Sequence, residues 1–267
     1  MLPPTGNVTL VFTDLRASSV LWSELGVLMR EALTLHDKVM RECLRKHRGY
    51  EVKSEGGSFM LAFDQASDAL AWCCDAQMRL LVAPWSPALL DHDVAGEVRS
   101  DDGHLIYAGL RVTMGLHSGE PDCRIDPTTG RMDYFGPVTN RAARIAAAAH
   151  EGQVLFSRSV WEECEDADKD GFDDLGSHRL RGLEGRVHIY SVLPSGLSGR
   201  RFPPPLTLDA IRTNLSDRGD RFIGRAEAIE AIEASFGQGH RLVTVMGASG
   251  LGKTRLAQRF GALRLQD

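Results

Sequence analysis

The chain has 267 residues, 43% of them hydrophobic and 25% charged, which allows one well-buried domain and part of a second. Its formal net charge of −5 gives no reason to expect nucleic acid or an anionic membrane as the main partner. No stretch approaches the roughly 18 apolar residues of a membrane span, the first residues lack the features of a signal peptide, and the five cysteines form no Cys-x-x-Cys pair. We therefore expect a cytoplasmic protein with reduced thiols.

The hydrophobic pattern of residues 7–117 alternates between the periods of strands and helices. Apolar residues recur at steps of three and four from about Ser19 to Arg45, which predicts one helix that Gly49 ends. The tight turn Glu55-Gly56-Gly57-Ser58 separates two short strand-like runs, which predicts a hairpin. The expected elements are a strand at 7–13, that helix, strands at 50–53 and 59–63, a helix at about 66–82, a surface insertion at 84–105 and a strand at 110–117.

The remaining residues of this region predict a shorter series of elements. Pro137 suits the first position of a helix, so a short helix is expected after the polar loop that follows residue 117. A strand near Val154, a helix from Ser157 and a strand over 188–192 complete the series. The order strand-helix-strand-strand-helix-strand is ferredoxin-like, so we predict an α+β fold with a βαββαβ core.

Three separated segments carry the most informative motifs. The first is an apolar strand that ends in a carboxylate, Val8-Thr9-Leu10-Val11-Phe12-Thr13-Asp14-Leu15. The others are at 110–121, Leu-Arg-Val-Thr-Met-Gly-Leu-His-Ser-Gly-Glu-Pro, and at 133–144, Asp-Tyr-Phe-Gly-Pro-Val-Thr-Asn-Arg-Ala-Ala-Arg. In this order and spacing they resemble the catalytic domain of class III nucleotide cyclases. The resemblance covers about residues 6–193, and that family elaborates the ferredoxin-like arrangement predicted above.

The resemblance implies a two-metal reaction in which a ribose 3′-hydroxyl attacks the α-phosphate and releases pyrophosphate. Asp14 matches one of the two aspartates that hold Mg²⁺ or Mn²⁺ in this family. The predicted hairpin closely resembles that of fungal and protozoan adenylyl cyclases, except that Gly57 stands where the second aspartate belongs. Glycine has no ligand atom. Glu55, two residues away, is an alternative ligand with a longer side chain.

Four further residues match the family's substrate-binding positions. Lys53 and Asp133 fit the pair that reads the base: an ammonium donates to adenine N1 and a carboxylate accepts from the 6-amino group. Asn140 and Arg144 are four residues apart on the helix after Pro137, so they share a face. In the family this asparagine orients the ribose, and this arginine stabilises charge that develops on the phosphates.

The resemblance implies a symmetric homodimer with sites at the interface, because the metal aspartates and the base-reading residues come from different protomers. Two hypotheses follow. The chain is an adenylate cyclase that makes cyclic AMP from ATP with a rate impaired by Gly57, or it is a pseudocyclase that binds nucleotide or a partner chain without turnover. His117 lies inside an apolar strand, which favours a structural role.

The composition changes after residue 193. Residues 194–220 contain Pro203-Pro204-Pro205 and several glycines, which predicts a linker. In 221–267, a helix is expected at about 226–236 and a strand at 241–246, followed by a P-loop over 247–254 with phosphate-binding candidates Gly247, Gly252, Lys253 and Thr254. This segment resembles the start of the signalling ATPases fused to bacterial cyclase domains. A P-loop fold needs further strands that 221–267 do not provide, so we expect no nucleotide hydrolysis by it.

Overall fold

The computed structural model describes residues 2–16, 18–164, 171–210, 224–248 and 250–264, and its chain forms two compact units. The first is Met1–Thr207 and the second Leu208–Asp267. The first unit ends well beyond residue 193, so the first part of the predicted linker, residues 194–207, belongs to this unit.

A seven-stranded sheet organises the first unit, in the order β10-β11-β9-β6-β1-β3-β2. Within it, β6, β1, β3 and β2 are antiparallel neighbours and have the strand order of a ferredoxin-like core, as predicted. The strands are β1 (Val8–Leu15), β2 (Tyr50–Glu55), β3 (Ser58–Phe63), β6 (Val112–Gly119), β9 (Val154–Ser157), β10 (Phe172–His178) and β11 (Val187–Val192).

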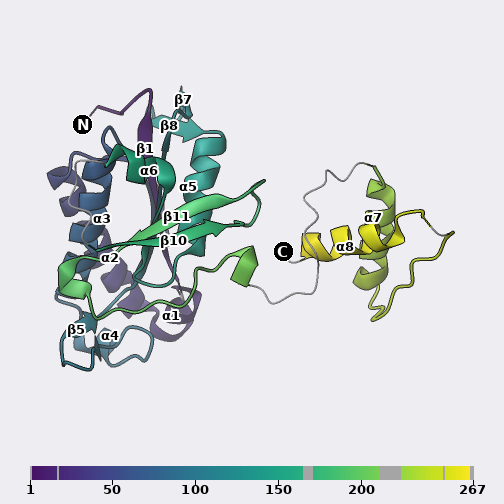
Figure 1. The fold of residues 1–267 in the computed structure, drawn as a ribbon. Helices are drawn as coiled ribbons and strands as arrows, with labels where there is room; N and C mark the ends of the chain where they lie inside the picture. Colours follow the sequence, from purple (N-terminus) through teal and green to yellow (C-terminus); the bar gives the residue numbers. More distant parts are fainter. Residues whose placement is uncertain (1, 17, 165–170, 211–223, 249, 265–267) are drawn as a thin grey trace. The chain divides into compact units, whose positions relative to one another are not determined.

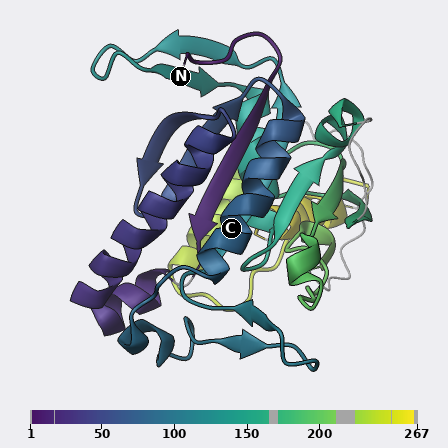
Figure 2. The ribbon, with the colours of Figure 1, turned by 90° about the vertical axis from the view of Figure 1, so that its left-hand side faces the viewer.

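Helices cover both faces of this sheet (Figure 1). The face turned toward the viewer in Figure 2 carries α2 and α3, and the opposite face carries α5. This layering follows from the sequence, because both α2 and α5 have an apolar stripe at helical spacing. The helices of the unit are α1 (Ser18–Leu25), α2 (Val27–Lys46), α3 (Ala66–Leu81), α4 (Pro87–Leu90), α5 (Pro137–Ala148), α6 (Arg158–Glu163) and the short 3-10 helix η1 (Ser195–Leu197).

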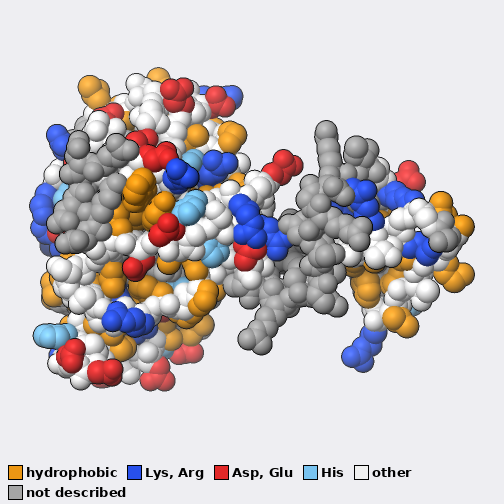
Figure 3. Space-filling view, viewed as in Figure 1, with side chains coloured by type: hydrophobic (Ala, Val, Ile, Leu, Met, Phe, Trp, Pro, Cys, Tyr) orange, Lys and Arg blue, Asp and Glu red, His pale blue; other side chains and the backbone are white. Residues whose placement is uncertain are grey.

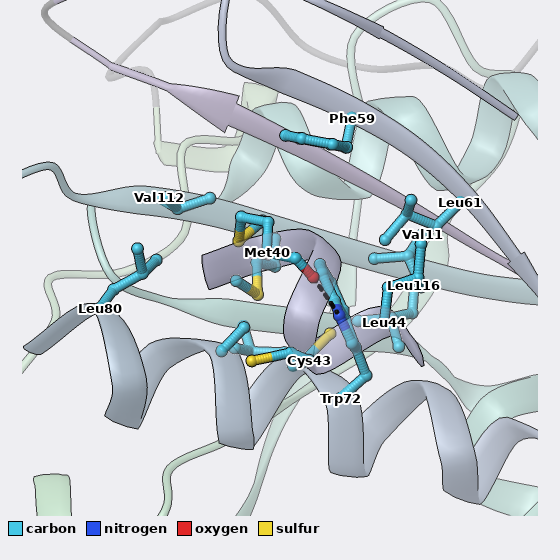
Figure 4. Close-up of a cluster of buried hydrophobic side chains, with 14 of the residues drawn as sticks. Val11, Met40, Cys43, Leu44, Phe59, Leu61, Trp72, Leu80, Val112 and Leu116 are labelled. Atoms are coloured by element: carbon cyan, nitrogen blue, oxygen red, sulfur yellow. Dashed lines mark hydrogen bonds between the residues drawn. The ribbon is translucent and has the colours of Figure 1, made fainter. Parts of the chain in front are cut away.

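The main core lies between the sheet and the α2–α3 layer (Figure 4). Trp72 is fully buried there, and its indole Nε1 donates to the Met40 carbonyl at 3.4 Å, so α3 is tied to α2. Val11 and Leu61 of the central strands pack against the same cluster. On the other face, Val8, Leu10 and Phe12 form a second apolar cluster with residues of β2, β3, α5 and β8.

The structure corrects three expectations for this unit. The predicted helix 19–45 is two helices, because Gly26 adopts φ 47° and interrupts the chain between α1 and α2. The polar loop before Pro137 contains a hairpin of β7 (Asp122–Ile125) and β8 (Met132–Phe135), and the insertion contains a second one, β4 (Val98–Arg99) with β5 (Leu105–Tyr107). Strand β10 was not predicted, because its sequence is polar and lies at a sheet edge.

The second unit contains η2 (Leu208–Ala210), α7 (Ala226–Gly237) and α8 (Lys253–Arg264). The rings of Phe236 and Phe260 stack between the two helices at 5.7 Å. The strand expected at 241–246 is wrong: these residues form no strand, and Leu242 and Met246 are 82% and 84% exposed. A strand needs a hydrogen-bonded neighbour, and the described part of this unit offers none.

The described surface of the first unit shows no large region of a single charge on the face drawn in Figure 3, as the modest net charge suggests. On the face shown in Figure 3, acidic, basic and hydrophobic side chains are interspersed over the first unit. Among the described helices, none is both long and apolar enough to cross a membrane.

Candidate active site

Asp14 is an exposed carboxylate near the end of β1. Val8, Leu10 and Phe12 belong to the apolar cluster on the α5 side of the sheet, and Asp14 continues their alternation onto that face. Its Oδ1 accepts a hydrogen bond from Ser58 Oγ at 2.8 Å. Ser58 was not identified from the sequence. Phe59 pairs with Thr13 across the sheet, so the residue before Phe59 lies opposite Asp14, and this register could have indicated the contact.

Gly57 occupies the tight turn between β2 and β3. Gly56 and Gly57 have φ of 58° and 90°, and Glu55 pairs with Ser58 around them, so this is a two-residue hairpin loop that requires positive φ. A Cβ at Gly57 would lie 2.3 Å from Leu15 Cδ1 and 2.7 Å from Leu33 Cδ2. The methyl groups of two leucine side chains therefore occupy the space that the Cβ atom of any other residue at this position would need.

The donor set near Asp14 fits one divalent cation better than two. The Asp14 carboxylate and the Ser58 hydroxyl are oxygen donors, which hard cations such as Mg²⁺ prefer, and Mg²⁺ often uses one or two carboxylates together with waters and substrate phosphates. Within the described ranges, no group of three or more His, Cys, Asp or Glu is placed to hold a metal. Gly57, at the position where the resemblance places the second aspartate, contributes no ligand atom.

Lys53 and Asp133 lie in direct contact although 80 positions separate them in the sequence. Lys53 Nζ donates to Asp133 Oδ1 at 3.1 Å and to Oδ2 at 2.9 Å, which joins β2 to β8. Asp133 is mostly buried, while the lysine side chain is 58% exposed. The ammonium also lies 5.8 Å from the centre of the Phe135 ring. The predicted pair therefore exists as an ion pair beside an aromatic surface.

Asn140 and Arg144 are exposed on α5, one turn apart, as predicted. Pro137 is the first residue of this helix, and Gly136 before it adopts φ 96°. The Arg144 guanidinium packs over Gly182, because a Cβ there would be only 3.3 Å from its Nη2. Gly182, in the loop before β11, thus gives the arginine room to lie close to the backbone.

The loop after β1 contacts the far end of α5. Arg16, two residues after Asp14, donates from Nη2 to the Ala147 carbonyl at 2.5 Å. The Nε of this arginine is buried and has no partner within the described structure. The Arg16 contact therefore attaches the loop of Asp14 to the helix of Arg144. The same face of the sheet, which α5 covers, also carries Lys53 and its partner Asp133.

His117 has the structural role that its apolar surroundings suggested. Its Nδ1 lies 2.7 Å from Ser157 Oγ and 3.1 Å from Ser159 Oγ, which ties β6 to the start of α6. Burial, together with the charge of Arg141, lowers the pKa of this imidazole to about 4. The histidine is therefore neutral near pH 7.

The P-loop candidates lie in the second unit. Lys253 starts α8 and its ammonium donates to the carbonyls of Gly247 and Ala248, both at 2.8 Å. The lysine is therefore bonded to carbonyls of its own loop at the start of a helix. Residues 241–246, which precede the loop, do not form the strand that a P-loop follows. Ser249, within the motif, lies outside the described residues.

A model of the adenylate and guanylate cyclase catalytic domain matches residues 2–194 of this chain. The chain belongs to this family. The match spans the whole seven-stranded sheet, and it leaves the second unit outside.

Curated relatives and solved structures agree with this assignment. The chain is 39% identical over 231 residues to an adenylate cyclase of Neurospora crassa and 34% identical over 220 residues to one of Schizosaccharomyces pombe. Each alignment covers 74% of this chain but only 10% and 13% of the respective relative, so the chain spans a small part of their length. A Trypanosoma brucei adenylate cyclase structure in its monomeric state matches with a TM-score of 0.68 and 29% identity, over 77% of this chain and 94% of that chain.

Proposed function

We propose that this cyclase domain converts ATP into 3′,5′-cyclic AMP and pyrophosphate at the interface of a homodimer, with a rate limited by Gly57. The observation that carries the proposal is the contact between Lys53 and Asp133, on the face that also bears Asp14 and α5. The 39% and 34% identical fungal relatives are both adenylate cyclases, which supports the choice of nucleotide.

The ion pair of Lys53 and Asp133 provides a base-reading device. Adenine presents an acceptor at N1 and a donor at its 6-amino group, so it can take the lysine as donor and the aspartate as acceptor. Guanine presents the opposite pattern and would leave buried polar groups without partners, which costs about 1–3 kcal/mol. The exposed lysine can move toward a ligand while the more buried Asp133 stays fixed by the bond from Tyr134 N at 2.8 Å.

Residues of β1 and α5 would bind the metal ion and the phosphates of the nucleotide. Asp14 would hold a divalent cation, Mg²⁺ or Mn²⁺, and Ser58 beside it orients the carboxylate. When bound, such a cation supplies charge neutralisation at the phosphates and makes the 3′-hydroxyl a better nucleophile. Arg144 would stabilise negative charge as it develops, and Asn140 would orient the ribose. Their exposure on α5 leaves both side chains accessible to a ligand.

A homodimer would assemble complete sites from two chains. In the proposed arrangement Asp14 of one protomer works with Lys53, Asp133, Asn140 and Arg144 of its partner, so that two-fold symmetry produces two equivalent sites. Phe135 and Ile125 of the β7–β8 hairpin are exposed apolar residues on the side of the base-reading pair, and they would gain from burial at such an interface.

A second candidate function is nucleotide binding without turnover. It is favoured by Gly57, which supplies no metal ligand and whose side-chain space is filled by Leu15 and Leu33. The test is a Mn²⁺-dependent assay for cyclic AMP and pyrophosphate, with ATP and GTP compared on the purified chain. Formation of cyclic AMP above that of an Asp14→Ala variant supports the cyclase. Binding of ATP without any product identifies the pseudocyclase.

A further inference from the structure

Residues 194–207, called the strap here, lie against the catalytic unit instead of forming a free linker. Leu197 is fully buried, and Arg200 and Thr207 are 4% and 5% exposed. The strap begins against α3, where Gly196 lies close to the Met78 side chain. It ends beside His178 of β10, whose Nδ1 lies 3.3 Å from Thr207 Oγ1. It is also the connection from the catalytic unit to the second unit.

Arg200 anchors the first part of the strap in the interior. Its guanidinium donates to the carbonyl of Ile106 at 2.8 Å, to Gln77 Oε1 at 2.8 Å and to the carbonyl of Gly152 at 2.9 Å. The Tyr107 ring lies 4.3 Å from the guanidinium carbon. Three fixed neutral acceptors and an aromatic face suit the planar fork of arginine and would not suit lysine.

The partners of Arg200 lead to the strand next to Asp14. Gln77, which accepts from Arg200, donates from Nε2 to the Val112 carbonyl at 2.9 Å. Val112 pairs with Leu15 in the β1–β6 ladder, and Thr113 beside it donates to the Asp14 carbonyl at 3.2 Å. Two hydrogen bonds therefore connect Arg200 to Val112, and the next residue of β6, Thr113, bonds the backbone of Asp14.

The second part of the strap caps the helix that carries Asn140 and Arg144. The last carbonyls of a helix lack partners inside it and need external donors. Leu206 N donates to the Ala148 carbonyl at 2.9 Å, next to the Ala147 carbonyl that Arg16 occupies. Just beyond the helix, His150 Nε2 lies 3.0 Å from the Pro204 carbonyl. The strap and the loop of Asp14 thus hold the same helix end.

We propose that Arg200 is a positioning residue for the cyclase reaction, because through the strap it fixes the C-terminal end of α5, which carries Arg144, and the start of β6, which pairs with the strand of Asp14. Each chain thereby presents both groups in a fixed position, one to each of the two sites of the proposed homodimer. This inference rests on the proposed function. The substrate does not touch Arg200, which is buried against Tyr107 and Gln77. Burial, with the nearby charge of Arg111, lowers the pKa of the guanidinium to about 10, and it remains protonated near neutral pH.

The test compares Arg200→Gln with Arg201→Gln in the full chain. Arg201 is the matched control, because it is exposed and its bonds within the described residues go to the nearby carbonyls of Ser198 and Arg200. A second variant, Leu206→Pro, removes the N–H that caps Ala148 and leaves Arg200 in place. Amide hydrogen exchange of residues 141–153 and 112–116 is measured for each, together with kcat and KM for Mn²⁺-ATP and the unfolding temperature.

For Arg200→Gln and Leu206→Pro, exchange at the end of α5 should be at least about tenfold faster, with the control unchanged. The kcat should fall about tenfold while KM stays within about twofold, because Lys53 and Asp133 are not attached to the strap. Unchanged α5 exchange in a folded variant overturns the proposal. Faster exchange with unchanged kcat also overturns it and leaves the strap a purely structural role. If the unsubstituted chain makes no cyclic AMP, the proposed function fails, and the exchange data alone decide whether the strap fixes α5.

Discussion

At the scale of single residues, the proposed limit on the rate rests on Gly57. The structure makes simple restoration of an aspartate less favourable than the sequence suggested, because the position requires φ near 90° and a Cβ would meet Leu15 and Leu33. Positive φ at a non-glycine residue costs on the order of 1–3 kcal/mol. An aspartate at position 57 should therefore raise the reaction rate through its carboxylate and lower the stability of the fold through strain in the turn.

Gly57→Asp, compared with Gly57→Asn, separates these two effects. Asparagine has the same shape and tolerates positive φ, but it supplies no charge to a cation. We expect both variants to unfold at lower urea concentration than the parent, and only the aspartate to raise kcat, by at least about tenfold. Adding Leu33→Ala to Gly57→Asp should increase the gain by making space. Equal rates for the aspartate and asparagine variants would contradict a metal role at this position.

Asp133 should determine the choice of base. ATP should be preferred over GTP by about tenfold or more in kcat/KM, because a mispaired buried polar group costs about 1–3 kcal/mol. Asp133→Ala should remove most of this preference, whereas Glu120→Ala, an exposed acid on the approach to the β7–β8 hairpin, should keep it. Steady-state kinetics with both nucleotides measure the ratio. An unchanged ratio in Asp133→Ala would show that another group reads the base.

At the scale of elements, the neutral His117 should make the β6–α6 contact sensitive to acid. Its folded-state pKa of about 4 lies below the ordinary value of 6.5, so its contribution to stability is complete above about pH 6.5 and is lost as the pH falls toward 4. The loss is on the order of 3 kcal/mol for a shift of this size.

Urea unfolding at pH 7 and pH 4.5 measures that contribution. The drop in unfolding free energy between the two values should be smaller in His117→Gln, which keeps an acceptor and does not titrate. His104→Gln, on an exposed histidine of the insertion, is the control and should behave like the parent. If His117→Gln shows the full drop, the acid sensitivity arises from other groups.

The P-loop segment should contribute nothing to catalysis. Its expected strand is missing in the described structure, and Lys253 is engaged with the carbonyls of Gly247 and Ala248. A phosphate-binding loop needs a strand and further core to be held open. Lys253→Ala should therefore leave the rates of cyclic AMP formation and of ATP hydrolysis unchanged, the latter at background. A clear loss of either rate would show that this segment works.

The elements that the sequence predicted best are those with strong periodicity. β1, the β2–β3 hairpin, α3 and α5 match their expected positions because buried faces dictate their patterns. β7 and β10 are polar and largely exposed, so these strands depend on tertiary partners that the pattern does not reveal. The same difference applies to the residues of the site. Lys53 and Asp133 were predicted from sequence motifs, whereas Ser58 and the strap could be identified only from the register and packing of segments distant in the sequence.

At the scale of the whole molecule, the strap changes how the chain is divided. The family match ends at residue 194, yet the compact unit continues to Thr207. A catalytic fragment cut after residue 193 would lose Arg200 and the cap on Ala148. Studies of the isolated domain should therefore retain residues up to 207.

Complementation between two inactive variants is the most direct measurement of the central claim, a cyclase site shared by two chains. Asp14→Ala and Arg144→Ala should each make no cyclic AMP from Mn²⁺-ATP when assayed alone. Mixed under conditions where chain exchange is shown independently, they should recover up to about a quarter of the parent activity, since random pairing gives half heterodimers with one intact site each. No recovery despite demonstrated exchange would contradict a shared site, and activity of either variant alone would contradict the assigned roles.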